Sequence, residues 1–399
     1  MSESVQKPRI RFKGFSDAWE QRKFEDLYNY ASEGGTPDTN NSSFYENGDV
    51  PFVKIEDTEN KYIDSTKSYI TQEGLSHSSA WLIPESSVIF TNGATVGNVA
   101  INRLPVATKQ GILGIIPSKN VVTEFLFYLL SSSTFQREVR SRMATGTFAT
   151  IILKNLNQIP VCIPSDKSEQ EEIAGYLSAF DNLITLHQRK YDKLVAVKKA
   201  LLGKMFPADG ETVPKIRFKG FSDAWEQRKL GDAVQITMGQ SPDGSTYSDV
   251  PSNYILVQGN ADLQNGWVSP RVWTSQMTKK ADAGDLIMSV RAPAGAMGKT
   301  AYNAVIGRGV AAIKGNEFIY QLLVKMDSDG YWKALSCGST FESLNSENIK
   351  NADVLIPDVD EQEKIGQYFA NFDNLITLHQ RQLEKLKNIK SALLEKMFV

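Results

Sequence analysis

The feature that most constrains this chain is an internal repeat. The segment IRFKGFSDAWEQRK occurs from Ile10 to Lys23 and again, unchanged, from Ile216 to Lys229. A second repeated unit recurs at a constant offset of 192 residues, where AFDNLITLHQRKYDKL from Ala179 matches NFDNLITLHQRQLEKL and KALLGKMF matches SALLEKMF. Each half of the chain therefore has a shared start, a private interior and a shared end, which predicts two copies of one architecture.

The shared end has the pattern of a long helix with a coiled-coil seam. Apolar residues recur at steps of about three and four, and acidic residues precede basic ones, as the helix dipole favours. A helix of roughly 38 residues spans about 57 Å, which is too long for one small domain to cover, so we expect the two copies to pair antiparallel. The histidines would be polar seam positions that set the register. The expected seam residues are Ile173, Phe180, Ile184, His187, Leu194, Ile365, Phe372, Ile376, His379 and Leu386.

The private interiors predict mixed domains. Runs such as VPFVKI and NYILVQGN are typical of strands bounded by turn residues, whereas TEFLFYLL and EFIYQLLVKM are typical of helices. The expected fold class is α+β, with two similar mixed α/β domains separated by two long antiparallel coiled-coil helices in a pseudo-two-fold, circular repeat. Joining the ends would close the cycle, so we expect the termini to lie near each other. The expected boundaries are 1–163 for the first domain, 164–213 for the first helix and linker, 214–356 for the second domain and 357–399 for the second helix.

Composition excludes several classes of protein. Hydrophobic and charged fractions of 41% and 23% are ordinary for a globular protein, and no apolar run is long enough to span a bilayer. The start of the chain lacks the apolar core of a secretory signal, and two cysteines cannot form a disulfide framework, so we expect a cytoplasmic protein. The three histidines and two cysteines lack metal-ligand spacing, which disfavours a zinc site. A net charge of −2 argues against a protein that grips nucleic acid unaided, but not against one that binds it with partners.

Motifs for catalysis are weak. Gly298, Lys299 and Thr300 match the end of a phosphate-binding loop, but Pro293 stands where its first glycine should be, and an ordinary tight turn explains the segment equally. GRGVAA lacks the full dinucleotide fingerprint. No Ser, His and Asp set and no pair of carboxylates stands out, so we expect no catalytic residue and no cofactor in this chain.

The repeated motifs resemble those of a known family. In each half, the residues IP, then EQ and then I precede a predicted long helix, and that helix contains FDNLI and ALL.KMF, where the dot stands for any residue. The second module opens with WEQRKLGD. This pattern resembles the DNA-specificity subunit of type I restriction-modification enzymes over nearly the whole chain. The first module departs from it locally, with FEDLYN in place of LGDAV.

The resemblance implies a function and partners. The two interiors would be target-recognition domains, each reading half of a split, asymmetric sequence in double-stranded DNA. The long helices would be the spacer between them and would dock two methyltransferase subunits, and restriction subunits through those. S-adenosylmethionine is expected on the methyltransferase partner. Non-identical modules imply a target that is not palindromic.

Base reading requires side chains with donors and acceptors at loop tips, with Arg or Lys suited to guanine and Asn or Gln suited to adenine. A solvated loop residue or a loop cap is the alternative for each candidate. In the first interior the candidates are Lys54, Asn92, Thr95, Asn98, Lys109 and Gln110. In the second interior they are Gln258, Asn260, Arg291, Lys299 and Arg308.

Two rival functions remain open from the sequence. A coiled-coil scaffold carrying two sugar- or peptide-binding modules would share the architecture without needing a methyltransferase. A nucleotide hydrolase built on GKT would need a base and magnesium ligands that we do not find. The identical starts would let interiors be exchanged on a constant scaffold, with Trp19 and Trp225 packing where module and helix meet.

Overall fold

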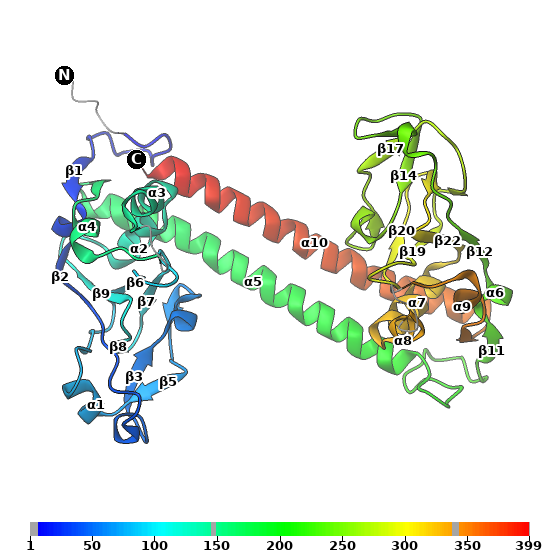
Figure 1. Cartoon of the computed structure of the whole chain (residues 1–399), viewed down its shortest axis with the longest axis horizontal. Helices are drawn as coiled ribbons and strands as arrows, with labels where there is room; N and C mark the ends of the chain where they lie inside the picture. The colour runs from blue at the N-terminus through cyan, green and yellow to red at the C-terminus, as the bar shows by residue number, and fades with distance from the viewer. Residues whose placement is uncertain (1–6, 145–148, 337–342, 399) are drawn as a thin grey trace. The chain divides into compact units, whose positions relative to one another are not determined.

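The computed structural model describes residues 7–144, 149–336 and 343–398. The chain divides into two compact units, one formed by Met1–Leu186 with Leu383–Val399 and the other by His187–Gln382. Each unit joins one mixed domain to part of each long helix (Figure 1). The sequence-based boundaries instead separated helices from domains. None of the described helices is long and apolar enough to cross a membrane.

The two long helices are α5, Lys167–Met205, and α10, Val359–Met397, with 39 residues each. In the second unit, Nδ1 of His187 lies 2.9 Å from Nδ1 of His379. Further along α5, Nζ of Lys198 donates to Oδ1 of Asp373 at 2.5 Å. Residue numbers rise along one helix as they fall along the other, so the helices are antiparallel, as the sequence predicted.

The expected seam residues lie on the inner stripe of each helix. Ile173 and Ile365 are fully buried where a helix meets a domain. The other eight are partly buried. The pKa of His379 is lowered, first by burial and then by the nearby His187 and Lys190. The two histidines therefore meet at a polar position of the seam.

The described residues of the first domain form three sheets and four short α-helices. A five-stranded sheet has the order β2-β9-β6-β7-β4, a three-stranded sheet has the order β5-β3-β8, and β1 pairs with β10. The strands are β1 Glu20–Lys23, β2 Tyr28–Glu33, β3 Val50–Val53, β4 Tyr62–Ile63, β5 Ser68–Ile70, β6 Val88–Thr91, β7 Val99–Asn102, β8 Ala107–Thr108, β9 Ile112–Pro117 and β10 Pro160–Ile163. The helices are α1 Gln72–Ser76, α2 Thr123–Ser131, α3 Ser133–Arg142 and α4 Leu153–Asn157.

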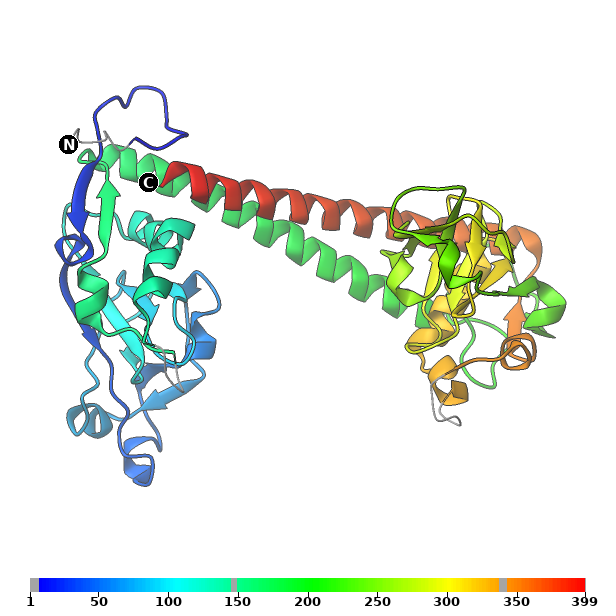
Figure 2. The same cartoon turned by 45° about the horizontal axis from the view of Figure 1, so that its top comes forward.

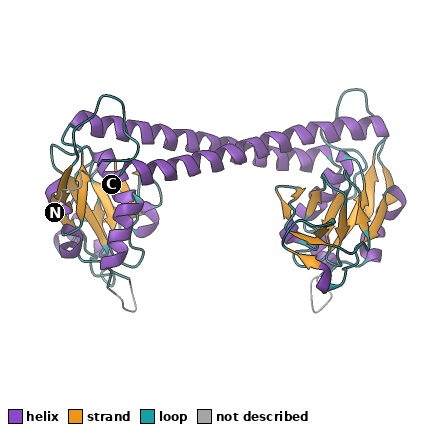
Figure 3. Cartoon of the chain, turned by 90° about the horizontal axis from the view of Figure 1, so that it is seen from above, coloured by secondary structure: helices purple, strands orange, loops and turns teal. Residues whose placement is uncertain are grey.

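The second domain follows the same plan. A six-stranded sheet has the order β12-β22-β19-β20-β16-β15, a five-stranded sheet has the order β13-β17-β14-β21-β18, and β11 pairs with β23. The strands, orange in Figure 3, are β11 Glu226–Lys229, β12 Gln235–Met238, β13 Tyr247–Ser248, β14 Tyr254–Val257, β15 Leu263–Gln264, β16 Trp267–Val268, β17 Val272–Thr274, β18 Lys280–Ala281, β19 Leu286–Ser289, β20 Met297–Lys299, β21 Ala304–Ile306, β22 Val310–Lys314 and β23 Asp353–Ile356. The helices are α6 Leu230–Ala233, α7 Glu317–Ser328, α8 Tyr331–Ser336 and α9 Ser346–Lys350.

The duplicated start segment forms the junction of domain and helix in the first unit (Figure 2). Arg11 donates from Nε and Nη2 to the two oxygens of Glu169, at 2.6 and 2.8 Å, and Trp19 donates from Nε1 to the same carboxylate at 3.2 Å. The Trp19 ring also packs on Phe398, which follows α10, and the Ile10 amide donates to the Lys396 carbonyl at 3.1 Å. The first copy of the start segment thus lies beside the end of α10, which agrees with the circular repeat.

The second unit repeats this junction with the equivalent residues. Arg217 donates to both oxygens of Glu361, at 2.7 and 2.8 Å, and Trp225 donates to it at 3.2 Å. Here the Trp225 ring packs on Phe206, which follows α5. Each start segment is therefore held between the beginning of one long helix and the end of the other, and both tryptophans lie at the junction that the sequence predicted for them.

Candidate nucleic-acid interface

Four of the five candidates in the second domain line one pocket, which has a volume of about 620 Å³. Gln258 follows β14, Asn260 lies at the start of a short turn of helix, Arg291 follows β19 and Arg308 occupies the turn between β21 and β22. The strand ends bring these loops together, although the residues are far apart in the sequence. We call this surface the second-domain pocket; it is completed by Ser241, Pro242, Gly244, Tyr247, Gly259, Ser289, Ala292 and Gly309.

Backbone contacts hold the loops of the pocket in place. The buried carboxylate of Asp262 accepts the Gln258 amide at 2.7 Å and the Gly259 amide at 3.2 Å. The hydroxyl of Ser241 accepts the Arg308 amide at 3.1 Å. A Cβ on Gly309 would stand 1.9 Å from the carbonyl oxygen of Gln258, so only glycine fits where this turn passes β14. The loops are therefore fixed while their side chains stay free for a ligand.

The pocket concentrates unpaired positive charge. In the part of the second domain that the structure describes, Arg217, Arg228 and Arg271 each pair with a carboxylate, whereas Arg291 and Arg308 pair with none. Both unpaired guanidinium groups belong to exposed residues. An exposed, unpaired guanidinium can bind a phosphate, or donate two hydrogen bonds to O6 and N7 of guanine. Gln258 and Asn260 add amides, which suit adenine.

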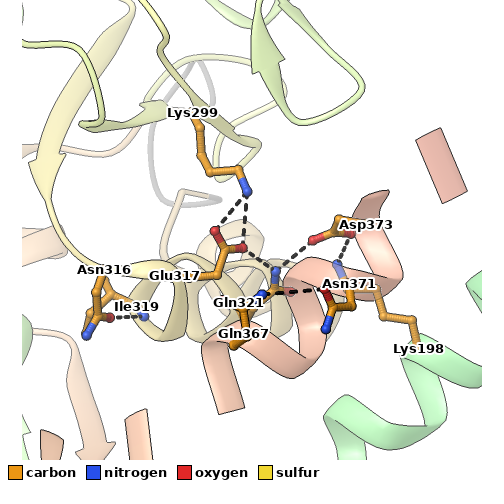
Figure 4. A network of polar contacts seen from close by, with 9 residues as sticks. All are labelled: Lys198, Lys299, Asn316, Glu317, Ile319, Gln321, Gln367, Asn371 and Asp373. Carbon is orange, nitrogen blue, oxygen red and sulfur yellow. Dashed lines mark hydrogen bonds and ion pairs between the residues drawn. The ribbon is translucent and has the colours of Figure 1, made fainter. Parts of the chain in front are cut away.

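The fifth candidate, Lys299, is not among the residues that line the pocket. Its side chain points toward Glu317 of α7 (Figure 4). Its ammonium donates to the carboxylate of Glu317 in α7, at 2.9 and 3.1 Å, and lies 4.5 Å from the ring centre of Tyr320. Thr300 turns its hydroxyl to the carbonyl of Tyr302 at 2.7 Å. The GKT segment therefore ends a strand and binds its own domain, which gives no support to a phosphate-binding loop.

The six candidates of the first domain separate by exposure. Thr95, Lys109 and Gln110 are exposed in loops, and Lys54 is partly buried after β3. Asn98 donates from its side chain to the hydroxyl of Thr58 at 3.2 Å, which joins the loop after β6 to the segment after β3.

Asn92 is the buried member of the set, with 4% of its surface exposed. Its side-chain Nδ2 donates to the Ile151 carbonyl at 3.2 Å, while its Oδ1 has no partner among the described residues. The structure thus places Asn92 inside the domain, and we leave it out of the interface proposed below.

Sequence reasoning missed the contribution of the loop after β12. Ser241 lines the pocket from this loop and holds the Arg308 turn, and Tyr247 lines it from the start of β13, which follows the loop. The sequence marked MGQSPDG as a turn, but not as part of a site. A Ser-Pro turn near a predicted strand end was the available signal.

Polar networks tie each domain to the long helices. In the first unit the Tyr128 hydroxyl donates to Asp181 of α5 at 2.5 Å, and Lys390 of α10 pairs with the same carboxylate. Nζ of Lys61 lies 2.8 Å from the Tyr128 hydroxyl, and burial lowers the pKa of this lysine to about 8, although Asp181 opposes the shift. The second unit uses Gln321, which donates to Asp373 at 2.7 Å.

Two modules of one fold, each fixed to a shared helix pair by the same contacts and each presenting different loops, define a class of two-part recognition scaffold. The family model for the type I restriction modification DNA specificity domain matches residues 16–196 and 222–388. Because this match covers most of the chain, the chain belongs to that family.

Individual relatives agree with this assignment. The type I restriction enzyme MjaIX specificity subunit of Methanocaldococcus jannaschii is 26% identical over 405 residues, covering 95% of this chain and 92% of that protein. The S subunit of a type I restriction-modification system from M. genitalium has the same fold, with a TM-score of 0.68, 14% identity and coverage of 99% of both chains. A chain from a structure concerned with the assembly and conformational transition of a type I restriction-modification system has a TM-score of 0.57, with 22% identity and coverage of 94% of this chain and 96% of that one.

Proposed function

We propose that this chain is the sequence-specific DNA-recognition subunit of a type I restriction-modification enzyme. Each domain reads one half of a split, asymmetric target in double-stranded DNA. The chain itself supplies recognition and no catalysis. It would act in the cytoplasm on DNA bound by the whole complex, and S-adenosylmethionine would be bound by the methyltransferase partner.

The observation that carries the proposal is the second-domain pocket. It combines two exposed guanidinium groups, which pair with no carboxylate of the described residues, with two partly buried amides, all on loops held in place by backbone hydrogen bonds. Base edges present the matching acceptors and donors, and phosphates present the matching charge. A neutral sugar or peptide would not require two unpaired arginines, so the scaffold with non-DNA modules is the weaker reading.

Exposed leucines on the long helices support docking of a partner. Leu183 and Leu186 of α5 are 43% and 47% exposed in the first unit. Leu375 and Leu378 of α10 are 46% and 49% exposed in the second unit, at the equivalent positions of the repeat. Two identical apolar surfaces would bind two copies of one protein, which fits two methyltransferase subunits, with restriction subunits bound through them.

The near-neutral charge of the chain fits a complex in which partner subunits supply much of the positive charge that binds DNA. Neutralisation of phosphates supplies much of the affinity for DNA, and this chain has a net charge of −2. We expect weak, salt-sensitive binding by the isolated chain and strong binding by the complex. Specific nanomolar binding by the chain alone would contradict that expectation.

The test is a base-resolution map of adenine methylation in cells that express the chain with a methyltransferase subunit, compared with the methyltransferase alone. A new split motif, methylated in each half, is the expected result. Replacing residues 24–162 with the interior of another specificity subunit should then change only one half. If the chain copurifies with the methyltransferase and no motif appears, DNA recognition is refuted; if it does not copurify, the scaffold alternative gains.

A further inference from the structure

The loops of the two domains can be matched by their backbone hydrogen bonds, although their sequences differ. In the first domain the Lys109 amide donates to the Val53 carbonyl at 3.2 Å. In the second, the Gly307 amide donates to the Val257 carbonyl at 2.8 Å. Lys109 and Gly307 are therefore equivalent, and the next residues along the chain, Gln110 and Arg308, occupy the same place.

A second bond of the same kind fixes the neighbouring loop. The Asn92 amide donates to the carbonyl of Gly111 at 2.9 Å, and the Val290 amide donates to that of Gly309 at the same distance. Asn92 and Val290 are thus equivalent. It follows that the residues after them, Gly93 and Arg291, share one position.

Isolated bridges confirm this match, because Gly93 pairs with Thr150 and Arg291 pairs with Ser343.

The third pair comes from the loops after β3 and β14. The Lys54 amide donates to the carboxylate of Asp57 at 2.9 Å, as the Gln258 amide does to Asp262 at 2.7 Å.

Three matched positions therefore carry different chemistry on one frame. They are Lys54 with Gln258, Gly93 with Arg291, and Gln110 with Arg308. The second domain has two guanidinium groups where the first has no side chain and an amide. All three second-domain members line the pocket.

We propose that these three matched positions determine base specificity in both domains, and that Arg291 and Arg308 read guanine in the half-target of the second domain. The inference rests on the proposed function and deepens it. Guanine presents O6 and N7 as a pair of acceptors in the major groove, which a guanidinium fork fits. The first domain lacks both forks, and Gln110 fits the N6 and N7 pair of adenine instead. The half-target of the first domain is therefore not read by a guanidinium at these positions.

The test uses methyltransferase complexes reconstituted with the full chain and mapped for methylated motifs. Arg308→Gln installs the residue that the first domain carries, and Arg291→Gly does the same at the other position. Each should relax one guanine position in one half of the motif, lowering discrimination roughly 5- to 150-fold at that position. Gln110→Ala should change only the other half. Lys280→Ala removes one positive charge from an exposed ion pair outside the pocket and should leave the motif unchanged.

Arg308→Lys separates base reading from phosphate binding, because it keeps the charge and loses the fork. A phosphate contact predicts a variant close to wild type at every position. Base reading predicts weaker discrimination than wild type at one guanine, because a single ammonium replaces the fork, but stronger discrimination than in Arg308→Gln, because lysine can still donate to guanine. Target DNA with 7-deazaguanine at the relaxed position removes the N7 acceptor and should weaken methylation by wild type but not by the variant.

Gly93→Arg, which would install an arginine in the first domain, is a less informative variant. Its Cβ would lie 3.1 Å from the Gly111 Cα, so the substitution could disturb the loop itself. Two outcomes overturn the inference. In the first, complexes with Arg291→Gly and Arg308→Gln are folded and keep both halves of the motif unchanged. In the second, the arginine variants change the same half of the motif as Gln110→Ala does. Absence of any motif with the wild-type chain refutes the proposed function itself.

Discussion

Phe206 and Phe398 occupy equivalent places in the two units, and truncating each should destabilise only its own unit. Phe206 is 2% exposed and packs against the rings of Trp225, Phe318 and Phe369. Phe398 is 3% exposed and packs against two rings, which lie in the first domain. Truncation of a buried phenylalanine to alanine costs about 3 to 5 kcal/mol, from lost burial plus the cavity.

The number of ring contacts sets the order of the two effects. An aromatic pair contributes about 0.5 to 1.5 kcal/mol beyond burial, so three contacts place Phe206→Ala near the upper end of the range. Phe398 makes two ring contacts, which places Phe398→Ala nearer the lower end of the range. We therefore expect a loss of about 4 kcal/mol for Phe206→Ala and about 3 kcal/mol for Phe398→Ala.

Hydrogen exchange measured by mass spectrometry can read the two units separately. Phe206→Ala should lower protection in peptides of the second domain, such as those covering β11 and β23, and leave β1 and β10 at their wild-type values. Phe398→Ala should do the reverse. Leu378→Ala is the control, because this leucine is 49% exposed and its truncation should change stability by less than about 0.5 kcal/mol. Equal loss of protection in both units after either substitution would refute the assignment of each phenylalanine to one unit.

Three further predictions concern charge, docking and DNA. Because burial lowers the pKa of Lys61 to about 8, from 10.5 in the unfolded chain, the folded state releases this proton first as pH rises. The unfolded state then binds more protons, so stability should rise between pH 8 and 10.5, and urea unfolding should show that this part of the rise is missing in Lys61→Met. Leu186→Glu and Leu378→Glu should each weaken the binding of one methyltransferase subunit, leaving a complex with one copy by native mass spectrometry; loss of both copies from either single variant would contradict two separate surfaces. Arg291→Ala should weaken DNA binding by the complex and, if the arginine also neutralises a phosphate, lower the salt slope by about one, in fluorescence anisotropy titrations at several salt concentrations.

The sequence predicted the junctions well because their residues contact one another. Arg11 and Trp19 belong to the duplicated start and bind Glu169 at the beginning of a repeated helix. Both partners of each contact recur in the second half of the chain, so the repeat itself contains the interface. The antiparallel pairing followed from helix length alone, since only the other helix is long enough to cover such an apolar stripe.

Individual loop residues were harder to place. Arg291 and Lys299 flank the same Gly- and Pro-containing loop, yet one lies exposed at the pocket and the other binds Glu317. The direction of a side chain at the end of a strand depends on the register of pairing, which spacing does not reveal. Asn92 and Lys61 show the same limit, because a polar residue near a strand end is either buried or exposed according to tertiary contacts that local sequence does not encode.

The contacts between private and shared segments explain how interiors can differ while the starts stay identical. The start segment binds mainly the shared helices and the phenylalanines that follow them, so its sequence is constrained by residues that never vary between the two halves. Each interior packs a phenylalanine, Phe125 or Phe318, against the tryptophan of the start segment and the phenylalanine that follows a long helix. Each interior also supplies a donor to the aspartate of the FDN motif in a long helix. That donor is the hydroxyl of Tyr128 in one unit and the amide of Gln321 in the other. The shared segments therefore require a ring and a donor at fixed places, and they leave the recognition loops free to vary.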